Sequence, residues 1–325
     1  MSATAEPSRQ SPTVPRVVVL LSAYNGRRFI DEQLDSILGQ LPPEGRLILR
    51  DDGSSDGTAD HVEARHDPRV SVIRGSNLGF SRSFLTLVAE APREADMVMF
   101  SDQDDVWMPD KIERAWAHLR PLAEGPALYG SAQMLVDERL RPLGSTRPWP
   151  RGPSLHSALT ENIITGCTAA FNQPALHLLQ RAGVPQAVHL HDWWVYLVIS
   201  AFGRVVWDER PTILYRQHGQ NQIGHGAGWW GRHLGVIRAL RRSDWVGILL
   251  FQIHSLVRHY GDQLPQHVRE LVTRYFELRT DYALPRWRLI FSLRRWRQGP
   301  AWDVALRLLL LVHRLRIWPP RSRRL

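Results

Sequence analysis

The sequence predicts an α/β fold with a mostly parallel sheet, followed by a basic helical region. Short β-branched apolar runs alternate with apolar residues at helical spacing from Val17 onward. Polar and acidic residues follow several of these runs, and the charge changes sign near Gly224. The alternation of strand and helix patterns is typical of βαβ units, in which helices join successive parallel strands.

Four apolar runs are predicted to form the first strands of the sheet, over residues 17–21, 47–49, 70–73 and 97–100. Apolar residues at helical spacing predict helices over 30–41 and 80–91. Further along, we expect a helix over 109–122, short strands near Leu128 and Thr168, and a helix over 193–201. Gly, Pro and Arg over 139–153 predict a long loop.

Composition indicates a folded protein of enzyme size. The chain has 325 residues, with 43% hydrophobic and 22% charged residues, which excludes a disordered chain. The single cysteine, Cys167, excludes an intramolecular disulfide framework and favours a reducing compartment. We expect Cys167 to be a small buried residue in a strand rather than a nucleophile. No apolar run approaches the roughly 18 residues of a membrane-spanning helix.

The chain is predicted to have three parts. Residues 1–15 are expected to be a disordered leader, 16–224 a catalytic domain, and 225–325 a helical basic region. The last part carries 19 Lys+Arg and 6 Asp+Glu, against 22 and 26 in residues 1–224. It also has 7 of the 13 tryptophans. Arginine with tryptophan is typical of interfacial helices, which predicts an anionic membrane surface as partner. The alternative is a basic helical appendage whose charges face solvent. Nucleic-acid binding is a further interpretation of the charge, but no nucleic-acid-binding motif accompanies it.

Asp102, Asp104 and Asp105 form an acidic loop directly after the fourth predicted strand. Three carboxylates in four residues repel one another unless a cation relieves them. Hard divalent ions take carboxylate oxygens and bridge to substrate phosphates, so a Mn²⁺ or Mg²⁺ site is predicted. The alternative is a solvated acidic loop. Trp107 and Pro109, which follow directly, are not typical of such a flexible loop.

Six segments together resemble the family 2 glycosyltransferases, which have the GT-A fold. They are LLSAYNG at 20–26, FIDEQLDSIL at 29–38, LRDDGSSDGT at 49–58, FSDQDDVWMPDK at 100–111, HDWW at 191–194 and YRQHGQNQ at 215–222. Their order and spacing agree over about 200 residues. SDQDDVW together with HDWW is most similar to the rhamnosyltransferase-type subgroup of bacterial cell-surface polysaccharide synthesis.

The resemblance implies a role for each matching position. It implies binding of the nucleotide-sugar donor by Ser22, Ala23, Tyr24, Asp52, Asp102 and Arg216. It implies metal binding by Asp104, Asp102 and His218, with Asp104 the most direct ligand and Asp105 the least certain of the three loop carboxylates. By itself, the segment around Asp52 would be a plain turn with helix capping, and a lone histidine is usually structural.

The resemblance also implies that Asp192 is the general base that removes the proton of the acceptor hydroxyl in an inverting displacement. The alternative is that Asp192 caps the helix that follows. Trp193 and Trp194 are candidates for acceptor stacking, although adjacent residues of a helix point in different directions, so at least one should be in the core.

The predicted activity is transfer of a sugar from a dTDP- or UDP-sugar to a saccharide acceptor, with dTDP-L-rhamnose as the first donor. A lipid-linked acceptor would place the protein on the cytoplasmic face of the inner membrane. A UDP-hexose or UDP-N-acetylhexosamine donor and a non-catalytic sugar-nucleotide-binding protein are alternatives. A nucleotidyltransferase would need a Gly-rich basic loop after the first strand, where this chain has Ser22 to Gly26.

Overall fold

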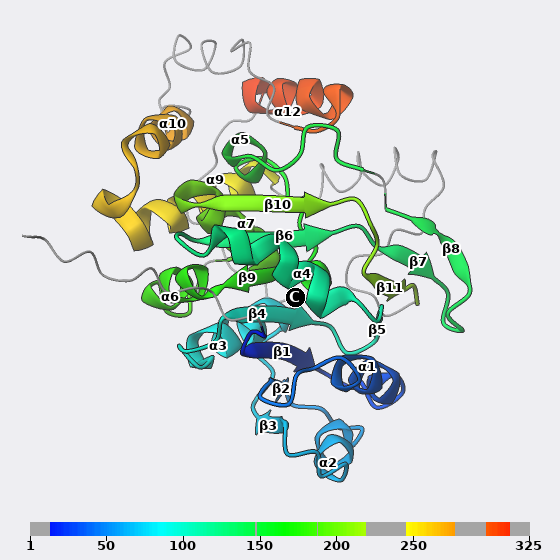
Figure 1. Ribbon diagram of the computed structural model, residues 1–325. Helices are drawn as coiled ribbons and strands as arrows, with labels where there is room; N and C mark the ends of the chain where they lie inside the picture. The colour runs from blue at the N-terminus through cyan, green and yellow to red at the C-terminus, as the bar shows by residue number, and fades with distance from the viewer. Residues whose placement is uncertain (1–13, 147, 187, 219–244, 277–296, 313–325) are drawn as a thin grey trace, which may run out of the picture.

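A computed structural model describes residues 14–146, 148–186, 188–218, 245–276 and 297–312. Within them, a seven-stranded sheet has the order β10-β6-β9-β4-β1-β2-β3 (Figure 1). Its strands are β1 (Val17–Ala23), β2 (Arg46–Asp51), β3 (Val70–Arg74), β4 (Met97–Ser101), β6 (Ala127–Ser131), β9 (Ala170–Asn172) and β10 (Arg204–Asp208). The predicted α/β class and the first four predicted strands are therefore confirmed.

The sheet is parallel except at β9, which runs antiparallel to both neighbours, β4 and β6. In the centre, Leu20 of β1 pairs with Ile48 of β2 and Phe100 of β4. All five residues of β4 and nearly all of β1 are buried, as expected for strands covered by helices on both faces. The parallel strands β1, β2 and β4 therefore end at one edge, where the loops after them meet.

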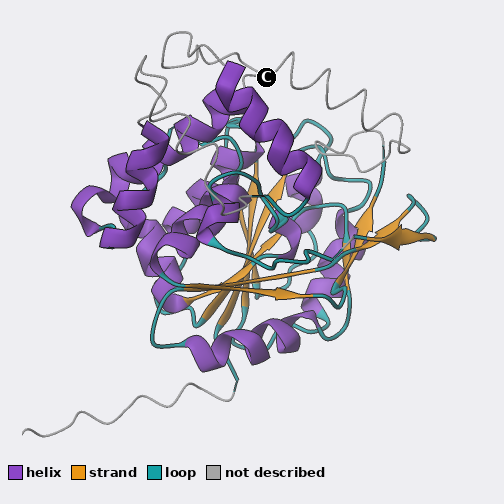
Figure 2. Ribbon diagram, turned by 90° about the horizontal axis from the view of Figure 1, so that it is seen from above, coloured by secondary structure: helices purple, strands orange, loops and turns teal. Residues whose placement is uncertain are grey.

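Helices cover both faces of this sheet (Figure 2). The α-helices are α1 (Ile30–Leu38), α2 (Thr58–Glu63), α3 (Phe80–Glu90), α4 (Lys111–Leu119), α5 (Leu155–Ala158), α6 (Gln173–Arg181), α7 (His191–Phe202), α9 (Trp245–Tyr260), α10 (Gln266–Phe276) and α12 (Pro300–Val312). The short 3₁₀ turns between these elements are η1 (Arg120–Leu122), η2 (Gly166–Thr168) and η3 (Gly261–Gln263). One core cluster joins the sheet to α1 and α4, and the other joins it to α3, α6 and α7.

The described helices of the C-terminal region continue the second cluster. Leu249 and Ile253 of α9, Val268 of α10 and Leu306 of α12 are buried in the same core as Trp194 of α7. The expected helical character of this region agrees with the described segments. No helix within the described residues is long and apolar enough to cross a membrane.

A second, four-stranded sheet has the order β5-β11-β7-β8 and lies beside the carboxyl end of the first. Its strands are β5 (Val106–Trp107), β7 (Met134–Val136), β8 (Pro142–Ser145) and β11 (Ile213–Arg216). The long loop predicted over 139–153 is thus wrong in part, because β8 pairs with β7 across a β-bulge. β11 brings the chain around His218 back against the acidic loop, since it pairs with β5.

The strand predicted near Thr168 is present as β9, but the predicted strand position of Cys167 is wrong. Both residues lie in the 3₁₀ turn η2, and the strand β9 begins at Ala170. Thr168 N donates to Thr165 O, so the chain turns before it can pair in the sheet. Cys167 is nevertheless fully buried, as expected.

Candidate active site

The loops after β1 and β2 are fastened to each other by side-chain hydrogen bonds to backbone N–H groups. Asn25 N donates to Ser54 Oγ at 2.9 Å, and Ser55 N donates to Asn25 Oδ1 at 2.9 Å. Asn25 has a left-handed backbone with φ of 52°, which asparagine tolerates better than most residues. Gly26 N donates to Thr58 Oγ1 at 3.0 Å. The first loop is therefore held in one shape before any ligand binds.

Gln103 ties the loop after β1 to the acidic loop after β4. Tyr24 N donates to Gln103 Oε1 at 2.8 Å, and Gln103 Nε2 donates to Tyr24 O at 3.1 Å. The Tyr24 side chain remains 50% exposed above this pair. Gln103 was not among the predicted site residues, and its only signal in the sequence is its position as an uncharged amide between Asp102 and Asp104.

Of the predicted nucleoside contacts, Ala23 and Asp52 are buried, while Ser22 is partly exposed and donates to Ser83 Oγ at 2.6 Å. The Asp52 carboxylate accepts from Leu78 N and Gly79 N, both at 2.9 Å, and is ion-paired with Arg50. These contacts show that Asp52 anchors the loop after β3. Its predicted contact with the base or ribose stays a prediction.

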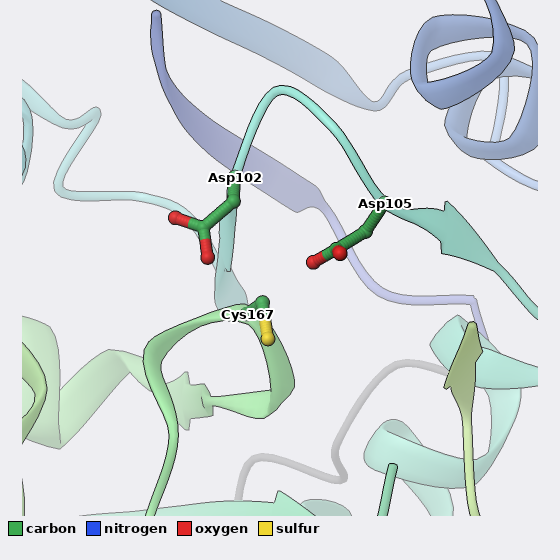
Figure 3. A group of neighbouring side chains, drawn as sticks. All are labelled: Asp102, Asp105 and Cys167. Atoms are coloured by element: carbon green, nitrogen blue, oxygen red, sulfur yellow. The ribbon is translucent and has the colours of Figure 1, made fainter. Parts of the chain in front are cut away.

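Asp102 and Asp105 project from the two ends of the acidic loop toward Cys167 (Figure 3). One ligand atom from each of the three residues lies within 4.8 Å of the other two. Burial raises the pKa of both carboxyls, and the neighbouring negative charges, Asp104 foremost, raise it further. Asp105 is fully buried, and its Oδ2 has no hydrogen-bond partner among the described residues. The group is thus a set of crowded anions that a cation would stabilise.

A buried lysine lies beneath this group. Lys111 is fully buried, and its Nζ donates to Cys167 O at 2.8 Å and lies 4.9 Å from the centre of the Trp107 ring. Burial lowers the pKa of Lys111 to about 8, although Asp105 and Asp102 pull it upward. The sequence did contain a signal for this lysine, because Lys111 shares the apolar helical stripe of Ile112, Ala115 and Leu119.

Asp104 and His218 come together from the acidic loop and the segment after β11. His218 Nε2 lies 2.8 Å from Asp104 Oδ2, and the His218 ring stacks on Phe29 with centroids 5.2 Å apart. Only 5% of the His218 side chain is exposed. A 2.8 Å separation suits two ligands of one divalent ion as well as a direct hydrogen bond. The structure thus places these two predicted metal ligands side by side.

Arg216, which the resemblance assigns to the donor, is buried among protein partners. This residue is 1% exposed, its N donates to Asp105 Oδ1 at 3.0 Å, and its Nε donates to Asp104 O at 2.8 Å. The remaining guanidinium nitrogens donate to Glu138 O and pair with Glu32. Through these contacts Arg216 positions the acidic loop, and its predicted contact with the donor stays a prediction.

Asp192 lies in the first turn of α7 and is 7% exposed. Its Oδ2 accepts from Gly166 N at 2.9 Å and its Oδ1 from Trp193 N at 2.7 Å. Burial raises the pKa of Asp192 to about 6, although the hydrogen bonds from Trp193, Gly166 and the Asn162 side chain lower it. The N-cap of α7 is Leu190, so the alternative reading of Asp192 as the N-cap residue is wrong.

Trp193 and Trp194, the candidates for acceptor stacking, are both buried, whereas the sequence required only one of them to lie in the core. Both side chains are 1% exposed, and Trp193 Nε1 donates to Ala158 O at 2.7 Å. Helix α7 is apolar on nearly every side because it lies between the sheet and α9, so both rings belong to the core. The neighbouring His191 is 4% exposed and stacks on Phe84 with centroids 4.1 Å apart.

The carboxylates of the acidic loop and the His218 imidazole fit a divalent cation. Carboxylate oxygens and an imidazole nitrogen suit Mg²⁺ and Mn²⁺, whereas the Cys167 thiol, whose pKa burial raises well above its usual value, is a poor ligand for hard ions. The unpartnered, buried Asp105 Oδ2 is the kind of atom that a bound cation would satisfy. Asp102, Asp104, Asp105 and His218 are therefore the candidate ligands of such an ion, and we call these four residues the candidate metal group.

Residues 18–177 form a glycosyl transferase family 2 domain, because they match the model of that family. The match includes the loops after β1, β2 and β4 but ends before Asp192. The chain is 28% identical to the dTDP-rhamnosyl transferase RfbG of Shigella flexneri over 238 residues, which cover 67% of this chain and 79% of that protein. It is a glycosyltransferase.

Two solved structures show the same fold. The Staphylococcus aureus protein TarS (residues 1–349), in complex with UDP-GlcNAc, superposes with a TM-score of 0.56 at 14% identity, covering 91% of this chain and 81% of that one. The mannosyltransferase PcManGT of Pyrobaculum calidifontis, in complex with GDP-Man and Mn²⁺, has a TM-score of 0.50 at 19% identity and covers 94% and 77%. The GT-A fold expected from the sequence is thereby confirmed.

Proposed function

We propose that this glycosyltransferase moves a sugar from a nucleotide diphosphate to a saccharide hydroxyl with inversion, using Asp192 as general base. One observation supports the proposal: the buried Asp192 carboxylate accepts from Trp193 N and from Gly166 N, and Gly166 directly precedes Cys167, which lies beside Asp102 and Asp105 of the candidate metal group. The negative charge of Asp192 also raises the pKa of Asp102.

Asp192 has the chemistry that a base needs. With a pKa of about 6, it is mostly ionised near neutral pH and still basic enough to accept a proton from a polarised hydroxyl. The bonds from Gly166 N and Trp193 N hold the carboxylate in one orientation, so it does not have to reorganise when the acceptor arrives. In a single displacement the acceptor oxygen forms the new bond to the anomeric carbon and the nucleotide diphosphate leaves with its electron pair.

The donor would lie across the loops after β1, β2 and β4. We assign the nucleoside to Ser22, Ala23, Tyr24 and Asp52, and the diphosphate side to Asp102. Asp104, Asp102 and His218 would hold Mn²⁺ or Mg²⁺. That ion supplies positive charge to the departing diphosphate when it is bound. Gln103 keeps the nucleoside loop and the metal loop at a fixed distance, because it bonds the Tyr24 backbone at both its N–H and its carbonyl.

dTDP-L-rhamnose is the first donor that we propose. Its support is the likeness to the dTDP-rhamnosyl transferase of Shigella flexneri and the SDQDDVW and HDWW segments. A UDP-hexose or UDP-N-acetylhexosamine would be handled by the same machinery. For the acceptor we propose a lipid-linked saccharide of cell-surface polysaccharide synthesis, at the cytoplasmic face of the inner membrane. The basic, tryptophan-rich C-terminal region supports this choice.

A donor panel tests the proposal. The purified chain is incubated with dTDP-rhamnose, UDP-glucose, UDP-N-acetylglucosamine and GDP-mannose, each with Mn²⁺, with Mg²⁺ or with a chelator. Release of nucleotide diphosphate is measured with and without saccharide acceptors. We expect turnover of one donor that depends on metal and is stimulated by acceptor. If no donor is turned over with any ion while the nucleotides bind, a non-catalytic binding protein is the better description.

A further inference from the structure

Helix α12 turns apolar side chains toward solvent. Trp302, Val304 and Leu308 are 38%, 56% and 55% exposed, whereas Asp303 and Leu306 are 4% and 2% exposed. Every exposed residue between positions 300 and 308 is apolar. A surface helix of a globular protein ordinarily has the reverse arrangement, with its charged residues outward.

The exposed residues lie on one side of the helix. At 100° per residue, Ala301, Val304, Ala305 and Leu308 form one stripe and Trp302 lies at its edge. The opposite side is fixed to the protein, with Leu306 in the core. The polar pair of Asp303 and Arg307, whose Oδ2 and Nε lie 2.8 Å apart, also avoids the outward stripe. We call this stripe the α12 face.

We propose that the α12 face docks on an anionic lipid bilayer, with the helix lying in the plane of the membrane surface. The positive charge of the C-terminal residues complements such a surface, because residues 304–325 contain six arginines and no acidic residue. Apolar side chains next to arginines are the composition of interfacial helices. The 13 residues of α12 span about 20 Å, which is short of the roughly 30 Å hydrocarbon layer.

The start of α12 is bonded to the segment that supports Asp192. Gln298 Nε2 donates to Gly152 O at 2.8 Å, and Arg297 Nε lies 3.4 Å from Glu161 Oε2. The residue after Glu161 is Asn162, whose side chain hydrogen-bonds Asp192. Docking of α12 therefore holds the general base near the bilayer. This consequence rests on the proposed function, since only a lipid-linked acceptor would need it.

Vesicle flotation of the full chain tests the proposal. Wild type is compared with Val304→Glu/Leu308→Glu, which charges the α12 face. The matched control is Val14→Glu/Leu143→Glu, because Val14 and Leu143 are 64% and 61% exposed elsewhere on the molecule. Vesicles contain phosphatidylcholine alone or with one-third phosphatidylglycerol. Donor turnover on a soluble saccharide acceptor, measured without vesicles, reports the proposed function separately.

We expect wild type and the control to float with the anionic vesicles, and the α12 variant to bind roughly tenfold more weakly or worse. All three proteins should turn over donor equally in solution. Equal flotation of the three proteins, or no flotation of wild type, would overturn the docking proposal even if turnover is normal. A wild-type dimer that becomes monomeric in the α12 variant would overturn it too, because a second copy would then cover the face. Flotation as expected without donor turnover would refute the proposed function alone.

Discussion

Replacement of Asp192 by asparagine separates the catalytic role of this carboxyl from its effect on stability. Asparagine keeps the size of the side chain and one acceptor oxygen, but it cannot take a proton. We expect the rate of sugar transfer to fall roughly 10²- to 10⁴-fold. Donor binding should change little, because Asp192 accepts from Gly166 N and Trp193 N and lies outside the loops assigned to the nucleotide.

The same substitution should change how stability depends on pH. The pKa of Asp192 is raised to about 6 in the fold, so its protonated form is favoured in the folded state. A raised pKa contributes stability at low pH that is lost as the pH rises through about 6. For a shift of the pKa from its ordinary value of 3.8 to about 6, this contribution falls by about 1.4 kcal/mol between pH 5 and pH 8.

Urea unfolding of both proteins at pH 5 and pH 8 measures this difference. Wild type should lose about 1.4 kcal/mol relative to Asp192→Asn on going to pH 8. The hydrogen bond that asparagine fails to make does not titrate, so it cancels between the two pH values. A difference that is the same at both pH values would refute the raised pKa. Turnover of the variant within threefold of wild type would refute Asp192 as the base.

Three further predictions concern the acidic loop. Asp104→Ala should abolish metal-stimulated transfer and weaken Mn²⁺ binding by calorimetry at least tenfold, with unchanged thermal unfolding in chelator. Gln103→Ala removes two bonds to Tyr24 and should raise the donor KM several-fold with a smaller change in kcat, as steady-state kinetics would show. Arg216→Met should lower the unfolding free energy by about 3 kcal/mol in urea titration, whereas a residue that only contacted donor would leave stability unchanged.

Local sequence patterns predicted the central strands well because those strands are buried on both faces. β1 and β4 appear as continuous apolar runs, and no other local structure explains a run of that length between polar loops. The loops after these strands could then be placed together at one edge. The second sheet could not be predicted this way. Its strand β5 has two residues and exists only because Ile213, more than a hundred residues later, pairs with Trp107.

The site, like the fold, was predicted only where local sequence carries the signal. Charged and polar residue types that stand out in a loop, such as Asp104 and His218, were found, and the structure brings those two together. Arg216 was assigned to the donor only through the resemblance of the YRQHGQNQ segment to the family. Its burial depends on the partners Glu32 and Glu138, which come from distant parts of the chain. The burial of both Trp193 and Trp194 could not be predicted, because the sequence does not show that α9 covers α7.

Protein contacts hold the acidic loop in its shape. Arg216 holds the Asp104 carbonyl and the Asp105 carboxylate, and Lys111 is fixed beneath them by the Cys167 carbonyl. These contacts keep carboxylates close together although burial and mutual repulsion raise the pKa of Asp102 and Asp105. A cation can therefore bind without reorganising the loop. For this reason Asp104→Ala should leave the fold intact, while Arg216→Met, which removes the bonds that hold the loop, should lower both stability and metal affinity.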